Sequence, residues 1–252
     1  MMLRRLFCLL LLLLPALHVL AQPRSLPVGS DATSFLNEQL RFRRVRAAQA
    51  TAGDKIAGQL RRHHIASQHL ELFLRLIKTN RALEVWARNA GEGPFSLLQA
   101  YPLATFSGSL GPKRHAGDEQ VPEGFYEIDR FNPASCCHLS LGLNYPNAAD
   151  RALGEPEPGG DIFIHGGTLT AGCLPITDAG IEEVYWLAVL ARTAGQLVIP
   201  VHIFPFPMTQ EEMAIRQGSP NEAFWQGLFP QYEYFTLHQQ LPTPAQLART
   251  RQ

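Results

Sequence analysis

The pattern of apolar and polar positions changes character three times along the chain. The first stretch is an apolar run over residues 6–20, which follows the positively charged start Met1–Arg5 and is interrupted by Pro15. Such a run is short for a membrane-spanning helix, which needs roughly 20 apolar residues. Val19-Leu20-Ala21 then supplies the small or moderate side chains of a cleavage site. The pattern predicts a secretory signal peptide over 1–21, with an uncleaved anchor as the alternative.

The second stretch, residues 22–80, carries a helical pattern in its later part. Residues 22–53 are rich in Pro, Ser, Arg and Ala and only weakly periodic, which predicts a linker followed by a marginal helix. Over 54–80 the apolar residues recur near helical spacing and Asp54 is a candidate cap, so we expect a helix there. Basic residues dominate between Arg41 and Arg62. They form either a solvated face or a contact with an anionic surface.

From residue 82 onward the pattern alternates, which is typical of strands. Leu83–Leu103 is expected as a hairpin and Ile181–Ala194 as a helix with Asp178 as its cap, while 144–160 is expected as a polar loop. We therefore expect an α+β fold that is mainly β. Its core domain would cover 81–207, and a helical extension and tail would cover 208–252. Further strands are expected at Gly124–Ile128, His138–Leu143, Asp161–His165 and Leu197–Phe204.

Composition excludes several classes of protein. The 252 residues are 46% hydrophobic and 17% charged, enough apolar material for a buried core, so wholesale disorder is excluded. A net charge of zero argues against a nucleic-acid binder. Four cysteines are too few for a disulfide scaffold, and Cys8 would leave with the signal peptide. The remaining three, Cys136, Cys137 and Cys173, are an odd number and imply at least one free thiol. The adjacent Cys136 and Cys137 could close only a strained ring, so no bridge is expected between them.

A candidate catalytic pair lies between His165 and Cys173. An expected strand ends at His165 and continues into Gly166-Gly167, and Cys173 directly follows Gly172. A cysteine nucleophile needs a base that creates the thiolate and backbone donors that stabilise an oxyanion. His165 is the candidate base, and the amides of Gly172 and Cys173 are candidate oxyanion donors.

Structural roles stay open for both residues at this point. A cysteine after glycine is often a small buried apolar residue, and a histidine at a strand end is often a satisfied structural group. A metal site is less favoured, because His165 and Cys173 lack further ligands at zinc-like spacing. A serine triad is not favoured either, because the sequence holds no G-x-S-x-G.

Around these residues the chain resembles the L,D-transpeptidase (YkuD catalytic domain) family, and specifically its YafK-like murein branch. His165-Gly166 matches the first part of the family motif and Thr170-Ala171-Gly172-Cys173 the second. Ala171 stands where most of the family has a second histidine, and the interval from His165 to Cys173 is shorter than in the broad family. The similarity runs roughly from Leu72 to Phe235. Other matching stretches are Gly111–Lys113, Gly117-Asp118, Val121–Tyr126, His138–Ser140, Asn144–Asn147, Asp150-Arg151 and Val201–Phe206.

The resemblance implies a periplasmic enzyme with an L,D-transpeptidase-type β-sheet core and peripheral helices, acting on peptidoglycan stem peptides. Cys173 is implied as the nucleophile and His165 as the proton donor and acceptor. The Gly166 carbonyl would orient His165, and the Gly172 amide would hold the oxyanion. Cys173 would attack the carbonyl of the L-centre of meso-diaminopimelate and form a thioester, which an amine or water resolves. No metal, organic cofactor, nucleic acid or membrane span after signal cleavage is implied.

Two further sets of expectations accompany this interpretation. Arg151 and Tyr145 are candidates for contact with a stem-peptide carboxylate, and His138 is a candidate group behind the catalytic pair, whereas His202 is expected to be structural. Two other functions stay open. One is an amidase that releases a lipoprotein from meso-diaminopimelate, and the other is a non-catalytic module that binds peptidoglycan.

Overall fold

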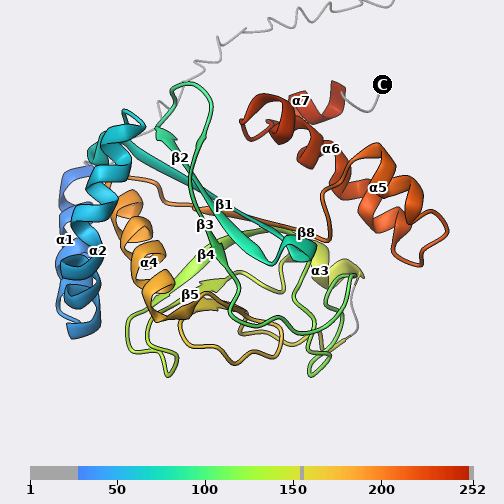
Figure 1. The fold of residues 1–252 in the computed structure, drawn as a ribbon, viewed down its shortest axis with the longest axis horizontal. Helices are drawn as coiled ribbons and strands as arrows, with labels where there is room; N and C mark the ends of the chain where they lie inside the picture. Colours follow the sequence, from blue (N-terminus) through green and yellow to red (C-terminus); the bar gives the residue numbers. More distant parts are fainter. Residues whose placement is uncertain (1–27, 154–155, 250–252) are drawn as a thin grey trace, which may run out of the picture.

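Eight strands form one mixed sheet in the order β3-β2-β1-β8-β4-β5-β6-β7 (Figure 1). The computed structural model describes residues 28–153 and 156–249, so the predicted signal peptide lies outside the described residues. β1 runs parallel to β8, β6 runs parallel to β7, and the other neighbours are antiparallel. This confirms the expected α+β fold with a sheet at its core. The strands are β1 Leu70–Ile77, β2 Ala82–Asn89, β3 Ser96–Pro102, β4 Gly124–Asn132, β5 Ser140–Leu143, β6 Phe163–His165, β7 Leu174–Pro175 and β8 Pro200–Phe204.

The helix expected over 54–80 is wrong in its second half, which is strand β1. Helix α2 (Arg43–Arg62) ends before His64, whose φ of 57° lies in the left-handed region. β1 is a central strand between β2 and β8 and is buried at all but one position. A strand buried on both faces is almost continuously apolar, so its residues also satisfy a helical template. Burial on both faces is therefore the physical reason for the misassignment.

The linker and marginal helix expected over 22–53 are replaced, from Val28 onward, by two helices. α1 (Val28–Leu40) and α2 both pack against α4 (Thr177–Thr193). The buried stripe of α2 includes Val45, Ala48, Ala52, Ile56 and Leu60, at helical spacing but with two alanines among them. Small apolar residues weaken the sequence signal, although they allow close helix packing.

Helices lie at two sides of the sheet, with α1, α2 and α4 on one side and the C-terminal helices on the other (Figure 1). α4 begins at Thr177, four residues before the expected start, so Asp178 lies in its first turn and is not its cap. The polar loop expected over 144–160 contains a short helix, α3 (Ala148–Leu153). Within the described part of the chain, no helix is long and apolar enough to cross a bilayer. The C-terminal helices are α5 Gln210–Ile215, α6 Glu222–His238 and α7 Pro244–Arg249.

A buried ion pair joins the sheet to α6. Lys78, just past β1, lies 2.9 Å from Glu123, and both side chains are fully buried. Lys78 also donates to the carbonyls of Gly111 (3.0 Å) and Val121 (2.9 Å). Glu123 accepts from the Gly111 amide at 2.7 Å and from the indole of Trp225, on α6, at 2.8 Å. The pair thereby fixes both the C-terminal helix and the loop before β4.

Candidate active site

His165 ends strand β6, and Cys173 directly precedes β7, the strand at the edge of the sheet. The register pairs Ile164 with Leu174 and His165 with Pro175. Cys173 lies in the bend just before this pairing begins, and the Phe163 amide donates to Cys173 Sγ at 3.4 Å. The structure therefore places the Cys173 thiol at the first residue of β6, two residues before His165.

The imidazole of His165 is held in one tautomer. Its side chain is buried, and Nδ1 lies 2.6 Å from the carbonyl oxygen of Gly166. A carbonyl only accepts, so Nδ1 carries the proton and Nε2 is left with its lone pair. This is the state in which a histidine accepts a proton from a thiol.

Gly166 has no room for a side chain. A Cβ at this position would lie 2.5 Å from Asp178 Oδ1 and 2.9 Å from the Cys137 carbonyl. The Gly166 amide donates to the carbonyls of Cys137 (3.1 Å) and Leu139 (3.2 Å), and the next amide, of Gly167, donates to Asp178 at 2.8 Å. The loop after β6 is thus fixed by the turn before β5 and by the first turn of α4.

The environment of Cys173 keeps its thiol protonated. Sγ is half-buried and donates to the Asp161 carbonyl at 3.5 Å. Burial raises the pKa of Cys173, and the Asp161 carboxylate adds to that rise, while the Phe163 amide and the Lys113 ammonium lower it. Burial and the Asp161 charge outweigh the opposing contributions. A neutral thiol of this kind needs a base at the moment of attack, which matches the free Nε2 of His165.

The turn before Cys173 presents a backbone donor. Gly172 has a φ of +98°, and a Cβ there would lie 2.8 Å from the Gln120 carbonyl, so only glycine fits. Thr170 Oγ1 donates to the Cys173 carbonyl at 2.7 Å and closes the turn. The Gly172 amide donates to Ser107 Oγ at 2.7 Å. The predicted oxyanion donor therefore has an oxygen acceptor in front of it already, supplied by a hydroxyl 65 residues away in sequence.

Lys113, the cation that lowers the pKa of Cys173, belongs to a loop organised by Asp118. Asp118 accepts hydrogen bonds from the Lys113 ammonium and from the amides of Arg114, His115 and Gln120. Burial alone would raise the pKa of Asp118, but these hydrogen bonds outweigh it and lower the pKa. The carboxylate therefore stays ionised and keeps Lys113 buried near the thiol.

His138 lies in a turn and not on the strand expected over His138–Leu143, because β5 begins only at Ser140. Its φ of 68° and the two hydrogen bonds that the Gly166 amide donates to the carbonyls of Cys137 and Leu139 mark a tight turn. His138 Nε2 lies 2.8 Å from Glu182 of α4, and Arg44 of α2 donates to the His138 carbonyl at 2.7 Å. His138 and Arg44 therefore fix this turn against helices α2 and α4.

The other two candidates for substrate contact are Tyr145 and Arg151. Tyr145 is buried, its hydroxyl donates to the Pro158 carbonyl at 3.0 Å, and burial raises its pKa well above the ordinary value. That hydroxyl packs one loop against another and is not presented to a ligand. Arg151 is exposed on α3. His202 is buried between the rings of Phe73 and Phe125, each 4.8 Å from its own, as expected for a structural residue.

Sequence reasoning missed the residues that support the pair from elsewhere in the chain, namely Ser107, Asp161 and Asp178. Ser107 and Asp178 reach the site only through the fold, and no local pattern marks them. Among the described residues, no group of three or more His, Cys, Asp or Glu side chains is placed to hold a metal ion.

Comparison with known proteins places the chain in a family. No family model matches it. It is 34% identical over 174 residues to the protein named "Putative L,D-transpeptidase YafK" from Escherichia coli K12, covering 68% of this chain and 69% of that protein. The same protein from Escherichia coli O157:H7 matches to the same extent.

Solved structures give lower similarity. The helical cell shape determining protein Pgp2 from Campylobacter jejuni aligns with a TM-score of 0.44 and 22% identity, over 57% of this chain and 52% of that chain. Bd1075 from Bdellovibrio bacteriovorus aligns with a TM-score of 0.40 and 18% identity, over 66% and 57%. This chain thus matches about half the length of Pgp2. Over more than two thirds of its own length it matches YafK, and the chain belongs to the YafK branch of the L,D-transpeptidase family.

Proposed function

We propose that this chain is a periplasmic cysteine acyl-transferase that acts on peptidoglycan stem peptides at the L-centre of meso-diaminopimelate. One observation carries the proposal. The Cys173 thiol accepts a hydrogen bond from the amide of Phe163, two residues before His165 on β6, and the Gly166 carbonyl fixes the proton of His165 on Nδ1, which leaves Nε2 as a base. Membership of the L,D-transpeptidase family supports the substrate class.

In the proposed first step, His165 Nε2 takes the thiol proton while Cys173 Sγ attacks the diaminopimelate carbonyl. The carbonyl oxygen becomes an oxyanion, which the amides of Gly172 and Cys173 stabilise after the hydroxyl of Ser107 yields its place. Collapse of this intermediate breaks the bond to the leaving amine, which receives the proton from His165. The product is a thioester on Cys173.

In the second step an acceptor attacks the thioester and restores the thiol. An amine of a second stem peptide completes transpeptidation, whereas water completes hydrolysis. In both cases His165 takes a proton from the acceptor and returns one to Cys173.

Acylation can be tested by intact-mass labelling with a thiol-directed acylating probe. Cys136 is exposed and Cys137 is half-buried, so both need replacement by Ser to leave Cys173 as the only thiol of the described chain. We expect one adduct in this background, none after Cys173→Ala, and labelling slowed about a hundredfold or more after His165→Ala. The absence of an adduct on a folded protein, or an adduct that survives Cys173→Ala, would favour a non-catalytic peptidoglycan-binding module.

The acceptor is a separate question. The second candidate is an amidase that releases a lipoprotein from meso-diaminopimelate, and it is favoured by the half-buried thiol beside an exposed Asp161, a position that water can reach. Digestion of isolated sacculi followed by mass spectrometry distinguishes the two. New diaminopimelate–diaminopimelate cross-links identify a transpeptidase, and released lipoprotein without new cross-links identifies the amidase.

A further inference from the structure

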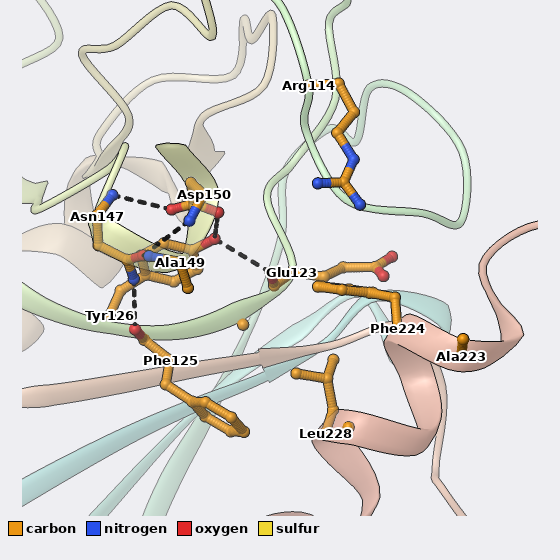
Figure 2. Close-up of a pocket in the computed structure, with 12 residues that line it drawn as sticks. Arg114, Glu123, Phe125, Tyr126, Asn147, Ala149, Asp150, Ala223, Phe224 and Leu228 are labelled. Carbon is orange, nitrogen blue, oxygen red and sulfur yellow. Dashed lines mark hydrogen bonds between the residues drawn. The ribbon is translucent and has the colours of Figure 1, made fainter. Parts of the chain in front are cut away.

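Two features of the described chain lie outside the candidate catalytic pair. One is a cavity of about 450 Å³ between the start of β4, helix α3 and helix α6 (Figure 2). The Asp150 carboxylate on its wall is engaged within the protein, by the Tyr126 hydroxyl at 2.9 Å and the Asn147 amide at 3.0 Å (Figure 2). The other feature is a pair of adjacent thiols, Cys136 and Cys137. Among the described residues, each of these thiols has only the other as a hydrogen-bond partner, so the pair is available to a reagent from solvent.

The turn between β4 and β5 brings the two thiols together. Successive side chains point to opposite faces in a strand, but Cys136 and Cys137 lie in a turn, and their Sγ atoms are 3.6 Å apart. The sulfur atoms of a disulfide are about 2.05 Å apart, so closing the bond needs an approach of roughly 1.5 Å. Cys136 is exposed and Cys137 is half-buried. A reagent in solvent therefore meets Cys136 first, and Cys137 lies within reach of the group that forms there.

The backbone on both sides of the two thiols is fixed. Arg44 of α2 donates to the carbonyls of Ser135 and His138, which flank the pair. The Cys137 amide donates to Ser135 Oγ at 3.1 Å. A ring closed by adjacent cysteines in such a turn is strained, and strained disulfides are easily reduced. A bond between these two sulfur atoms is therefore reversible.

The backbone of Cys137 also contacts the loop that carries the candidate base. The Gly166 amide donates to the Cys137 carbonyl at 3.1 Å, and the Gly166 carbonyl accepts from His165 Nδ1 at 2.6 Å. The contact is tight, because a Cβ at Gly166 would lie 2.9 Å from the Cys137 carbonyl oxygen. Burial raises the pKa of the Cys137 thiol, and the neighbouring Cys136 and the charge of Cys173 add to that rise. The dithiol and the candidate nucleophile therefore influence each other.

We propose that Cys136 and Cys137 are a site of reversible oxidation, at which a low-molecular-weight disulfide converts the two thiols into one intramolecular disulfide. In the first step the Cys136 thiolate attacks one sulfur of the reagent. A mixed disulfide forms, and the other half of the reagent leaves as a thiolate that takes up the proton lost from Cys136. In the second step the Cys137 thiolate attacks Cys136 Sγ and releases the second half, which takes up the proton of Cys137. The two protein thiols lose two electrons, and the reagent is reduced to two thiols.

Oxidation of the pair is expected to slow acylation of Cys173, a consequence that rests on the proposed function. Closing the bond draws the two sulfur atoms together and displaces the backbone of Cys137. The Cys137 carbonyl is an acceptor of the Gly166 amide, so Gly166 moves with it. The Gly166 carbonyl then no longer holds His165 in place. A displaced base takes the thiol proton less efficiently.

Peptide mapping by mass spectrometry tests the oxidation site on the full chain. Trypsin cleaves after Arg130 and Arg151, so one peptide, 131–151, carries both thiols, while Cys173 lies in a different peptide. The protein is treated with oxidised glutathione, and the remaining thiols are then blocked with N-ethylmaleimide. We expect peptide 131–151 to lose two hydrogen atoms and to carry neither glutathione nor the blocking group. Dithiothreitol should restore both thiols.

Two variants test the order of attack. Cys137→Ser removes the second thiol and is expected to trap the mixed disulfide, with one glutathione on Cys136. Cys136→Ser leaves only the half-buried thiol, which should react with glutathione about tenfold more slowly. Circular dichroism establishes that each variant is folded. The proposal is overturned if peptide 131–151 keeps both thiols, if each cysteine carries its own glutathione, or if the disulfide joins this peptide to the one that contains Cys173.

The effect on Cys173 is measured with the thiol-directed acylating probe before and after oxidation. Oxidation is expected to slow acylation about tenfold, and dithiothreitol should restore the rate. The double variant Cys136→Ser/Cys137→Ser is the control and should be unaffected by oxidised glutathione. Equal slowing in the double variant would mean that glutathione reacts with Cys173 itself, which overturns the link between the two sites. If Cys173 is not acylated even in the reduced protein, the proposed function fails, whereas the peptide map still decides whether the dithiol is an oxidation site.

Discussion

The pKa of Cys173 is influenced by one acidic and one basic side chain, Asp161 and Lys113. The exposed one, Asp161, can be replaced without disturbing the fold. Asp161 raises the pKa of Cys173, and its side chain is 81% exposed and lies 2.8 Å from Arg130. The bond that Sγ makes to residue 161 is to the backbone carbonyl and survives substitution. Asn also tolerates the φ of +55° at this position. Asp161→Asn is therefore a conservative way to test the electrostatics of the thiol.

The expected result of Asp161→Asn is a lower pKa for Cys173. The pH profile of thiol alkylation then shifts to lower pH, and the rate at pH 7 rises about two- to fivefold, a modest effect because solvent screens the exposed charge. Iodoacetamide labelling across pH 6–10, in the background without Cys136 and Cys137, measures it. Asp129→Asn is the matched control, since Asp129 also pairs with Arg130, at 3.0 Å, but does not influence Cys173. An unchanged profile for Asp161→Asn would show that its carboxylate has no influence on the thiol.

His202 makes stability depend on pH. Burial lowers its pKa to about 3, and Nδ1 has no hydrogen-bond partner. The unfolded chain takes up a proton near pH 6.5 and the folded chain does not, so this residue reduces stability as the pH falls from 6.5 toward 3. The slope is about 1.4 kcal/mol per pH unit.

Replacement of His202 by Leu is expected to remove this contribution. Urea unfolding at pH 7.5 and pH 5 measures the free energy of unfolding of both proteins. Between these values the wild-type chain should lose about 2 kcal/mol more than His202→Leu. Equal losses in the two proteins would mean that His202 is protonated in the folded state.

At the scale of elements, the turn between β6 and β7 depends on glycine at position 172. Gly172→Ala combines a positive φ with a Cβ 2.8 Å from the Gln120 carbonyl, so the turn must shift. We expect a stability loss of about 1–3 kcal/mol and at least a tenfold slower acylation of Cys173, measured by thermal unfolding and intact mass. Gly53→Ala, in α2 with no atom within 4 Å of the added Cβ, is the control and should be neutral or slightly stabilising. Normal acylation of Gly172→Ala would mean that the turn tolerates the change.

The elements of this fold differ in how well the sequence predicts them. The hairpin of β2 and β3 was predictable because β2 alternates between buried and half-buried positions. β1 was not, because a strand buried on both faces loses alternation and its apolar residues also fit a helix. The candidate pair of His165 and Cys173 stands out in the sequence because both lie within one short motif, and its catalytic role stays a prediction. Ser107 and Asp178 do not stand out, since only the fold brings them to that motif.

At the scale of the whole molecule, the ion pair of Lys78 and Glu123 joins parts that are distant in sequence. It links β1, the loop that carries Lys113 and Arg114, and helix α6 through Trp225. Burial lowers the pKa of Lys78, while Glu123 opposes that shift. Removing one partner of such a pair leaves the other as an uncompensated buried charge, which costs more than the pair itself contributes.

Lys78→Met is therefore expected to lower the free energy of unfolding by roughly 3–5 kcal/mol, measured by urea denaturation. Adding Glu123→Gln removes the stranded charge and should recover about 1 kcal/mol or more, although Trp225 then loses a charged acceptor. Lys55→Met is the surface control. Lys55 pairs with Glu183 but its side chain is 51% exposed, so its loss should cost less than about 1 kcal/mol. If Lys78→Met costs no more than Lys55→Met, the pair does not hold α6 to the sheet. If the pair does hold α6 to the sheet, Trp225 fluorescence should change together with stability in Lys78→Met, because the Glu123 carboxylate also binds the indole of Trp225.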